Sequence, residues 1–108
     1  MSAEYLEVAS LEQVPVGHSR VVWVSGKEIA LFNVGGEVYA TDDRCLHQKW
    51  SLSASKLVGK IVACTAHNWK YDVTTGEMIY GKGMKLNSYP VKVVEGKIFV
   101  AIEKSALG

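Results

Sequence analysis

Short apolar runs rich in Val, Ile, Tyr, Phe and Trp alternate with glycine-containing polar segments along the chain. The alternation of apolar and polar residues is clearest near the end of the chain, where Ile98, Val100 and Ile102 share one face of an expected strand. No segment keeps the 3.6-residue period that is typical of a helix. The pattern therefore predicts an all-β protein of the sandwich or barrel kind.

The apolar runs also indicate where the strands and turns lie. Strands are expected at residues 4–8, 19–24, 28–34, 37–41, 60–63, 68–72, 77–80, 89–94 and 97–102. Glycine accepts positive φ, so hairpin turns are expected at Ser25-Gly26, Gly35-Gly36, Thr75-Gly76 and Glu95-Gly96. One helical turn is expected at residues 10–13, with Ser10 as its N-cap. Because no linker, repeat or low-complexity segment interrupts the chain, we expect a single domain spanning residues 1–108.

The candidate chemistry of the chain lies in two cysteine–histidine pairs. Cys45 and His47 have C-x-H spacing, and Cys64 and His67 have C-x-x-H spacing. The remaining histidine, His18, lies far from both pairs in the sequence and is expected on the surface. Two thiolates and two imidazoles suit a [2Fe–2S] cluster in which two histidines replace two cysteines on one iron. With one or two intervening residues on a tight loop, each pair contributes one ligand to each iron.

Two other interpretations use the same side chains. A mononuclear zinc site with two cysteines and two histidines usually pairs the cysteines as C-x2–4-C and the histidines as H-x3–5-H. Mixed C-x-H and C-x-x-H pairs are unusual for zinc, so the iron–sulfur cluster is favoured over structural zinc. A site that binds no metal is the third alternative.

Composition narrows the class of protein further. The chain has 108 residues with 48% hydrophobic and 21% charged side chains, which is ordinary for one small globular domain. A formal net charge of +1 argues against nucleic acid as a main partner. The sequence contains no apolar run of about 18 residues and no signal-peptide pattern, so we expect no membrane association. Two cysteines with ligand spacing indicate a reducing compartment, and we expect a cytoplasmic protein.

The segment from Asp42 to Met78 resembles the cluster-binding region of Rieske-type ferredoxins. The family pattern is C-x-H, about 16 residues, C-x-x-H-x-W-x-F/Y-D and then T-G-E. This chain has Cys-Leu-His from Cys45, Cys-Thr-Ala-His-Asn-Trp-Lys-Tyr-Asp from Cys64, and Thr-Gly-Glu from Thr75. The resemblance implies stacked antiparallel sheets with a small cluster-binding subdomain at about residues 42–86, one cluster per chain, cysteines on the buried iron and histidines on the outer iron.

The resemblance also implies a function. Rieske-type ferredoxins are soluble one-electron carriers that pass electrons from a flavoprotein NAD(P)H reductase to a terminal oxygenase of an aromatic-ring or related hydroxylating system. The chain is then expected to be a monomer and not itself an enzyme. One alternative is a small Rieske subunit of a larger redox enzyme, such as a nitrite-reductase-type assembly. The remote alternative is a structural module that binds zinc.

Residues around the ligand pairs have expected roles of their own. High-potential members of the family have an extra cysteine in each ligand loop and a serine two residues after the second histidine, and this chain has neither. The resemblance therefore implies a reduction potential in the low part of the Rieske range of about −150 to +300 mV. A hydrogen bond from the Tyr71 hydroxyl to the sulfur of Cys45 is expected to raise that potential slightly, because a donor stabilises the more negative reduced cluster. The alternative role of Tyr71 is half-buried strand packing.

The tryptophans and lysines near the pairs have two interpretations each. Trp69 is expected to pack beneath the cluster, whereas Trp50 is either core or an exposed anchor for a redox partner. Trp23 is expected to pack as an ordinary strand residue. Residues 81–85 form either a loop that covers the flank of the cluster or an ordinary connection. The lysines in or beside the three loops form either a positive rim for an acidic partner or solvated loop positions; they are Lys49, Lys70, Lys82 and Lys85.

Overall fold

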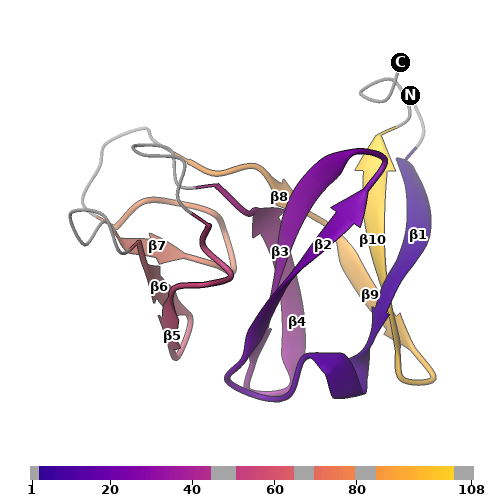
Figure 1. The fold of residues 1–108 in the computed structure, drawn as a ribbon, viewed down its shortest axis with the longest axis horizontal. Coiled ribbons are helices and arrows are strands. Elements are labelled where there is room, and N and C mark those ends of the chain that lie inside the picture. Colours follow the sequence, from indigo (N-terminus) through magenta and orange to yellow (C-terminus); the bar gives the residue numbers. More distant parts are fainter. Residues whose placement is uncertain (1–2, 45–50, 65–69, 80–84, 104–108) are drawn as a thin grey trace.

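The computed structural model describes residues 3–44, 51–64, 70–79 and 85–103 (Figure 1). Strands predominate in these residues, and the helical structure in them is one short 3₁₀ turn, η1 (Leu11–Gln13). The strands are β1 (Ala3–Ser10), β2 (Ser19–Val24), β3 (Lys27–Val34), β4 (Glu37–Asp42), β5 (Lys56–Val58), β6 (Ile61–Ala63), β7 (Lys70–Asp72), β8 (Ser88–Tyr89), β9 (Val91–Val94) and β10 (Lys97–Glu103). The all-β expectation is confirmed.

The strands form three antiparallel sheets. The first has the order β1-β10-β9, the second β2-β3-β4-β8 and the third β5-β6-β7. The first two sheets lie face to face, and the small third sheet stands apart on the side of the β3–β4 pair (Figure 1). We call β5-β6-β7 and the segments that follow it up to Leu86 the small lobe. This arrangement agrees with stacked sheets and a small subdomain.

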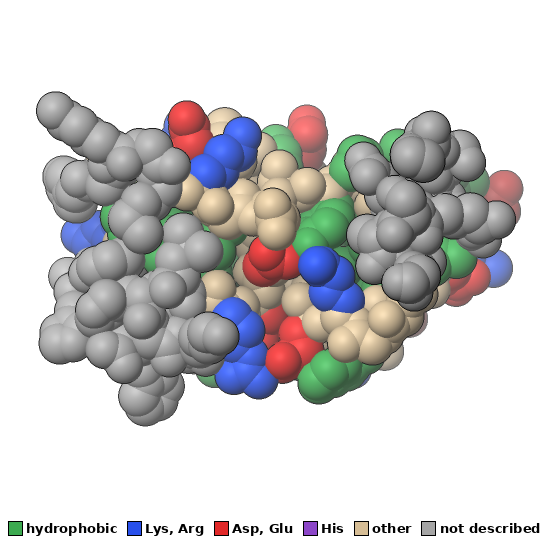
Figure 2. Space-filling view, turned by 90° about the horizontal axis from the view of Figure 1, so that it is seen from above, with side chains coloured by type: hydrophobic (Ala, Val, Ile, Leu, Met, Phe, Trp, Pro, Cys, Tyr) green, Lys and Arg blue, Asp and Glu red, His purple; other side chains and the backbone are tan. Residues whose placement is uncertain are grey.

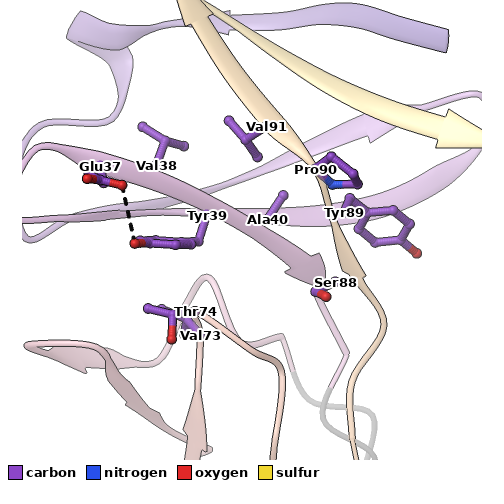
Figure 3. A pocket seen from close by; sticks show the side chains of 10 residues that line it. All are labelled: Glu37, Val38, Tyr39, Ala40, Val73, Thr74, Ser88, Tyr89, Pro90 and Val91. Carbon is purple, nitrogen blue, oxygen red and sulfur yellow. Dashed lines mark hydrogen bonds between the residues drawn. The ribbon is translucent and has the colours of Figure 1, made fainter. Parts of the chain in front are cut away.

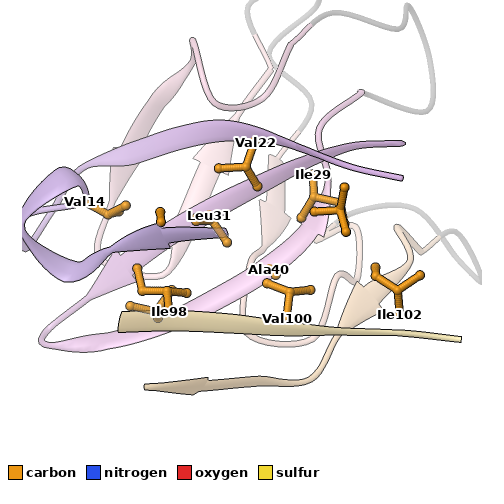
Figure 4. Packing of buried hydrophobic residues seen from close by; sticks show 11 residues of the cluster. Val14, Val22, Ile29, Leu31, Ala40, Ile98, Val100 and Ile102 are labelled. Atoms are coloured by element: carbon orange, nitrogen blue, oxygen red, sulfur yellow. The ribbon is translucent and has the colours of Figure 1, made fainter. Parts of the chain in front are cut away.

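Strand β3 is the centre of the fold because it is buried on both of its faces. Ile29 and Leu31 belong to a core between the first two sheets, where they meet residues of β10 such as Val100 (Figure 4). Ala30 and Phe32 belong to a second core on the opposite face, together with residues of the small lobe. All four side chains are fully buried. A strand with successive buried positions therefore joins the sandwich to the small lobe.

The expected strands and the observed ones differ at three places, and one of them is β5 (Lys56–Val58), a strand that the sequence pattern did not predict. The expected strand 89–94 is wrong, because the chain changes sheets at Pro90: Tyr89 pairs with β4 and Val91 pairs with β10. Proline has no N–H to donate to a ladder, so it marks the point where one strand ends and another begins. Residues 77–79 form no named strand, and Glu77 and Met78 contribute isolated bridges instead.

Three of the four predicted turns are two-residue hairpin turns with positive φ at both central residues. Ser25 and Glu95, which are not glycines, have φ of 51° and are each followed by a glycine with positive φ. The third such turn is Gly35-Gly36, and at Thr75-Gly76 only Gly76 has positive φ. Ser10 precedes the 3₁₀ turn as predicted, and its N–H donates to the Gln13 side chain at 2.9 Å.

Trp23 corrects the expectation of ordinary strand packing. The side chain is 66% exposed, although its neighbours Val22 and Val24 are buried. Trp23 lies opposite Glu28 in the β2–β3 register and therefore shares the face of Ala30 and Phe32. The small lobe packs on Ala30 and Phe32 of this face. Trp23 lies on the edge strand β2, outside that core, and stays exposed to solvent.

Candidate metal centre

The two predicted ligand pairs fall in two connections of the same length. Residues 45–50 join Arg44 to Ser51, which pair in an antiparallel bridge, and residues 64–69 join Ala63 to Lys70, which pair in the β6–β7 ladder. Each connection therefore has six residues and begins with a cysteine. These two antiparallel pairs hold the ends of each connection close together. A short connection with its ends held in this way can direct two ligands at the same cluster.

Residues next to the connections insert their side chains into one common core. Leu52 follows the first connection, Cys64 opens the second and Tyr71 comes shortly after it. Leu86 follows residues 80–84, the third segment near the expected site. All four are at most 1% exposed and belong to the core that also contains Phe32. Three separate stretches of chain are therefore fixed on one apolar base that stands on β3.

Main-chain hydrogen bonds tie the same stretches to one another. The N–H of Asp42 donates to the carbonyl of Asn87 at 2.9 Å, which joins the chain before the first connection to the chain after residues 80–84. The N–H of Ile79 donates to the carbonyl of Lys70 at 2.9 Å, which joins the chain before residues 80–84 to the end of the second connection. The site thus has a braced base built from residues far apart in sequence.

A buried carboxylate organises the first connection. Asp43 is 0% exposed, and its two carboxylate oxygens accept hydrogen bonds from the Ser51 hydroxyl at 2.7 Å and from the Ser53 N–H at 2.8 Å. Its carbonyl accepts the Leu52 N–H at 2.6 Å. One residue before the connection therefore binds three consecutive residues after it, and the bridge between Arg44 and Ser51 closes the same turn.

The neighbouring Asp42 carries a second, more accessible network. Its carboxylate accepts hydrogen bonds from the side-chain amide of Asn87 at 2.9 Å and from the hydroxyl of Tyr89. Burial and the hydrogen bond and charge of Asp42 together raise the pKa of Tyr89 above its ordinary value. The ammonium group of Lys27 lies 5.9 Å from the centre of the Tyr89 ring. This network fastens β4 to β8 at the end of β4 that precedes the ligand pairs.

Arg44 is held from the other side. Its guanidinium forms two-pronged hydrogen bonds with the carboxylate of Glu28 on β3, with N–O distances of 2.8–3.0 Å. The side chains are 51% and 22% exposed, so the pair contributes orientation more than stability. Glu28 also accepts the Asp43 N–H through its carbonyl at 3.4 Å. The residue before Cys45 is therefore fixed to the central strand.

The structure describes only two of the predicted site residues, and their roles stay predictions. Cys64 lies at the end of β6 and is buried, and Tyr71 is fully buried in the second core rather than half-buried. The other predicted residues lie outside the described part of the chain, and they are Cys45, His47, Trp50, His67 and Trp69. The described residues alone contain no group of three metal-binding side chains, because three of the four predicted ligands are not among them.

Sequence reasoning did not single out the residues that brace the site. Asp42 and Asp43 stand directly before Arg44 and the first ligand pair, and this acidic doublet was the available signal. Their roles differ, since one is half-buried and the other fully buried. The roles of Ser51, Ser53 and Asn87 depend on contacts between distant segments and have no pattern in the sequence.

The donor set fits a two-iron cluster. Each six-residue connection begins with a cysteine and contains one histidine, and the cysteine of the second connection, Cys64, is buried. Together the two connections supply two thiolates and two imidazoles. On the face seen in Figure 2, the described charged side chains include both Lys or Arg and Asp or Glu. Lys85 is exposed and Lys70 half-buried, whereas Lys49 and Lys82 lie outside the described residues, so a positive rim stays a prediction.

A groove separates the sandwich from the small lobe on another side. It has a volume of about 460 Å³ and is lined by β4, the turn after β7 and the β8–β9 junction (Figure 3). Tyr39, Thr74 and Pro90 are among its lining residues, and the Tyr39 hydroxyl donates to Glu37 at 3.4 Å. Cys64, the predicted ligand that lies in the described part of the chain, is not among the described residues that line this groove. The described residues also include no helix that is long and apolar enough to cross a membrane.

Comparisons with known proteins agree with this geometry. The model of the Rieske [2Fe-2S] domain matches residues 4–90. The ferredoxin component of the naphthalene 1,2-dioxygenase/salicylate 5-hydroxylase systems of a Ralstonia species is 36% identical over 104 residues, which are 95% of this chain and 100% of the relative. The biphenyl dioxygenase ferredoxin subunit of Pseudomonas sp. strain KKS102 is 33% identical over 95% of this chain and 96% of the relative.

A solved structure has the same fold. A chain in the complex of reduced oxygenase and oxidized ferredoxin in carbazole 1,9a-dioxygenase has a TM-score of 0.82 at 32% identity, over 90% of this chain and 92% of that one. The predicted resemblance to Rieske-type ferredoxins and the predicted fold are confirmed. The cofactor of the protein is a Rieske-type [2Fe–2S] cluster, and the chain belongs to the Rieske [2Fe-2S] domain family.

Proposed function

We propose that this protein is a one-electron carrier whose cluster is bound by Cys45, His47, Cys64 and His67. The observation that supports this ligand set is the matched pair of six-residue connections, each beginning with a cysteine and closed by an antiparallel pair. The cluster supplies a reversible one-electron site. The chain holds this site on a braced base, and its described residues contain no nucleophile–base set for substrate chemistry.

The proposed electron acceptor is a terminal oxygenase of an aromatic-ring or related hydroxylating system. Support comes from relatives named as ferredoxin components of naphthalene and biphenyl dioxygenase systems and from the likeness to a chain in an oxygenase–ferredoxin complex. A flavoprotein NAD(P)H reductase is the proposed donor, because a one-electron carrier needs a partner that splits the electron pair of a nicotinamide. We propose a monomer of one domain, residues 1–108, that works in the cytoplasm.

The bracing of the small lobe suits electron transfer. A carrier that changes shape little on reduction loses little energy to reorganisation, and the three braced segments limit such change. Tyr71 and Leu86 are fully buried beneath the site, so water is excluded from its inner side. Histidine ligands on the outer side would then provide the route by which the electron leaves.

The first experiment records absorption and low-temperature EPR spectra of the purified protein, as isolated and after dithionite, with iron and sulfide analysis. Two irons and two sulfides per chain, with a reduced rhombic signal at a lower average g than an all-cysteine cluster gives, are expected. Replacing Cys64 or His67 by Ser or Asn should abolish this signal, whereas His18→Asn should leave it intact. A colourless protein with one zinc would contradict the proposal.

A second experiment separates a carrier from a permanent subunit. The photoreduced protein is mixed with an oxidised terminal oxygenase of a naphthalene-type system in a stopped-flow instrument. A carrier is reoxidised at a rate that rises with oxygenase concentration and runs alone as a monomer in size-exclusion chromatography. Reoxidation only within a stable co-purifying assembly, such as a nitrite-reductase-type enzyme, would favour the alternative.

A further inference from the structure

We propose that the buried carboxylate of Asp43 lowers the reduction potential of the cluster. The inference rests on the proposed function, because it concerns the charge felt by a cluster bound at Cys45. Asp43 is not a ligand in this proposal, and it acts on the cluster through its negative charge. The argument depends on three features of this residue: its burial, the lack of a compensating cation among the described residues and its place in the chain.

Burial distinguishes Asp43 from the carboxylates around it. Its side chain is 0% exposed, whereas Asp42 is half-buried and Glu77 is exposed. A charge in a low-dielectric interior acts over a longer distance than one in water, since neither solvent nor salt screens it well. The carboxylate is retained there by the Ser51 hydroxyl at 2.7 Å and the Ser53 N–H at 2.8 Å.

No cation among the described residues neutralises this charge. The ion pairs of these residues join Arg44 to Glu28 and Lys60 to Asp72, and Asp43 has none. The two donors to Asp43 are a hydroxyl and an amide, which stabilise a carboxylate without carrying an opposite charge. These hydrogen bonds satisfy the carboxylate oxygens but bring no positive charge next to them.

The place of Asp43 in the chain brings its charge close to the proposed ligand. Asp43 and Cys45 are separated by one residue, so their Cα atoms are at most about 7.6 Å apart. Reduction adds one negative charge to the cluster, and a fixed negative charge on the residue two positions before a ligand disfavours the reduced form. The carboxylate therefore shifts the equilibrium toward the oxidised state and makes the reduced protein a stronger donor.

The test is the midpoint potential of Asp43→Asn, measured by redox titration followed by EPR. Asparagine has the shape of aspartate and keeps one oxygen for the Ser53 N–H, but it lacks the charge. We expect the equilibrium constant for reduction to rise about tenfold or more, which for one electron is about 59 mV upward. Iron content, sulfide content and g values should stay those of the wild type.

Three matched variants separate charge from loop structure. Ser51→Ala removes a hydrogen bond to the carboxylate but keeps its charge, so the potential should not rise. Glu77→Gln removes an equal charge from an exposed position in the small lobe, and its effect should be less than a third of that of Asp43→Asn. Asp43→Glu keeps the charge and should keep the potential close to that of the wild type.

Each outcome decides the matter. An intact cluster with an unchanged or lowered potential in Asp43→Asn overturns the inference but leaves the proposed carrier function standing. Should Asp43→Asn lose the cluster, Asp43→Ser is titrated instead, and a raised potential there supports the inference. If both neutral variants lose the cluster while Asp43→Glu holds it, the carboxylate is only structural and the inference fails. A wild-type protein without a cluster would refute the proposed function itself.

Discussion

Asp42 and Asn87 bind each other twice. The main-chain N–H of Asp42 donates to the carbonyl of Asn87 at 2.9 Å, and the side-chain amide of Asn87 donates to the carboxylate of Asp42, also at 2.9 Å. The two residues are 45 positions apart, and each stands close to a segment proposed to surround the cluster. This reciprocal pair couples the entry of the first ligand connection to the exit of residues 80–84.

The first prediction concerns this coupling. Asn87→Ala removes the side-chain bond and leaves the main-chain bond, so the free energy of unfolding should fall by about 1 kcal/mol. The cluster should also be lost faster to an iron chelator, since the two segments separate more easily. Ser88→Ala, at the exposed neighbouring residue, is the control and should change neither quantity. Equal chelation rates for Asn87→Ala and the wild type would contradict the prediction.

The second prediction compares two glycines with the same backbone conformation. Gly76 and Gly96 have φ of +85° and +77°, so an added Cβ strains both by about 1–2 kcal/mol. At Gly76 the Cβ would also lie 2.5 Å from the carbonyl oxygen of Leu86, whereas at Gly96 nothing lies within 4 Å. The oxygen cannot retreat easily, because the Leu86 N–H is bonded to the carbonyl of Gly76 at 2.8 Å.

Gly76→Ala should therefore destabilise the protein more than Gly96→Ala, by an additional amount of about 1–3 kcal/mol. Denaturant unfolding of the two variants measures the difference, and only Gly76→Ala should also accelerate loss of the cluster. Equal destabilisation by the two substitutions would show that the contact with Leu86 relaxes without cost.

The third prediction tests the proposed hydroxyl bond of Tyr71. The side chain is fully buried in the core beneath the ligand connections, so Tyr71→Phe keeps the packing and removes only the hydroxyl. If that hydroxyl donates to the sulfur of Cys45, its loss should lower the midpoint by tens of millivolts, where about 59 mV is a tenfold change. An unchanged midpoint in a variant with a full cluster would leave Tyr71 a packing residue.

The fourth prediction is a pH dependence at Tyr89. Burial and the hydrogen bond to Asp42 raise the pKa of Tyr89, so the folded protein favours its protonated form. The stabilisation is then complete below pH 10, the ordinary tyrosine value, and it is lost as pH rises through the folded pKa. In an alkaline absorbance titration, Tyr89→Phe should remove one tyrosinate from the most alkaline part of the curve.

Asp42→Asn is the matched variant for this titration, because it removes the charged acceptor and leaves Tyr89 in place. It should move the tyrosine to a lower pKa, although burial keeps that pKa above the ordinary value. Loss of a tyrosinate near pH 10 in Tyr89→Phe would contradict the assignment.

The sequence carried enough information for the site chemistry and for most strands. Ligand spacing is a local property, so the pairs at Cys45 and Cys64 predicted the cofactor without any structure. Local alternation likewise placed β2 at Ser19–Val24. The change of sheets at Pro90 could not be predicted in the same way, because two adjacent short strands that pair with different partners read as one run.

Exposure and bracing were also beyond the sequence. Trp23 reads as a core residue by composition, but it lies on an edge strand outside the core that the small lobe forms with β3. Asp43 reads as a solvated loop carboxylate, since aspartate is rarely fully buried. Its burial follows from the return of residues 51–53 to the end of β4, a contact between segments that local patterning does not specify.

The last prediction uses the two faces of β3. Leu31 packs in the core between the large sheets, and Phe32 packs in the core that supports the ligand connections. Leu31→Ala should cost about 2–5 kcal/mol and Phe32→Ala about 3–5 kcal/mol, because both side chains are fully buried and leave cavities. Both variants should therefore unfold at lower denaturant concentration than the wild type.

The two variants should differ in what happens to the cluster before the protein unfolds. Phe32→Ala loosens the base shared by Leu52, Tyr71 and Leu86, so chelators should remove iron faster at denaturant concentrations where the fold persists. Leu31→Ala weakens the sandwich and leaves that base packed, so iron loss should follow global unfolding. If iron loss follows global unfolding in both variants, the small lobe and the sandwich unfold as one cooperative unit. The braced base then has no stability of its own.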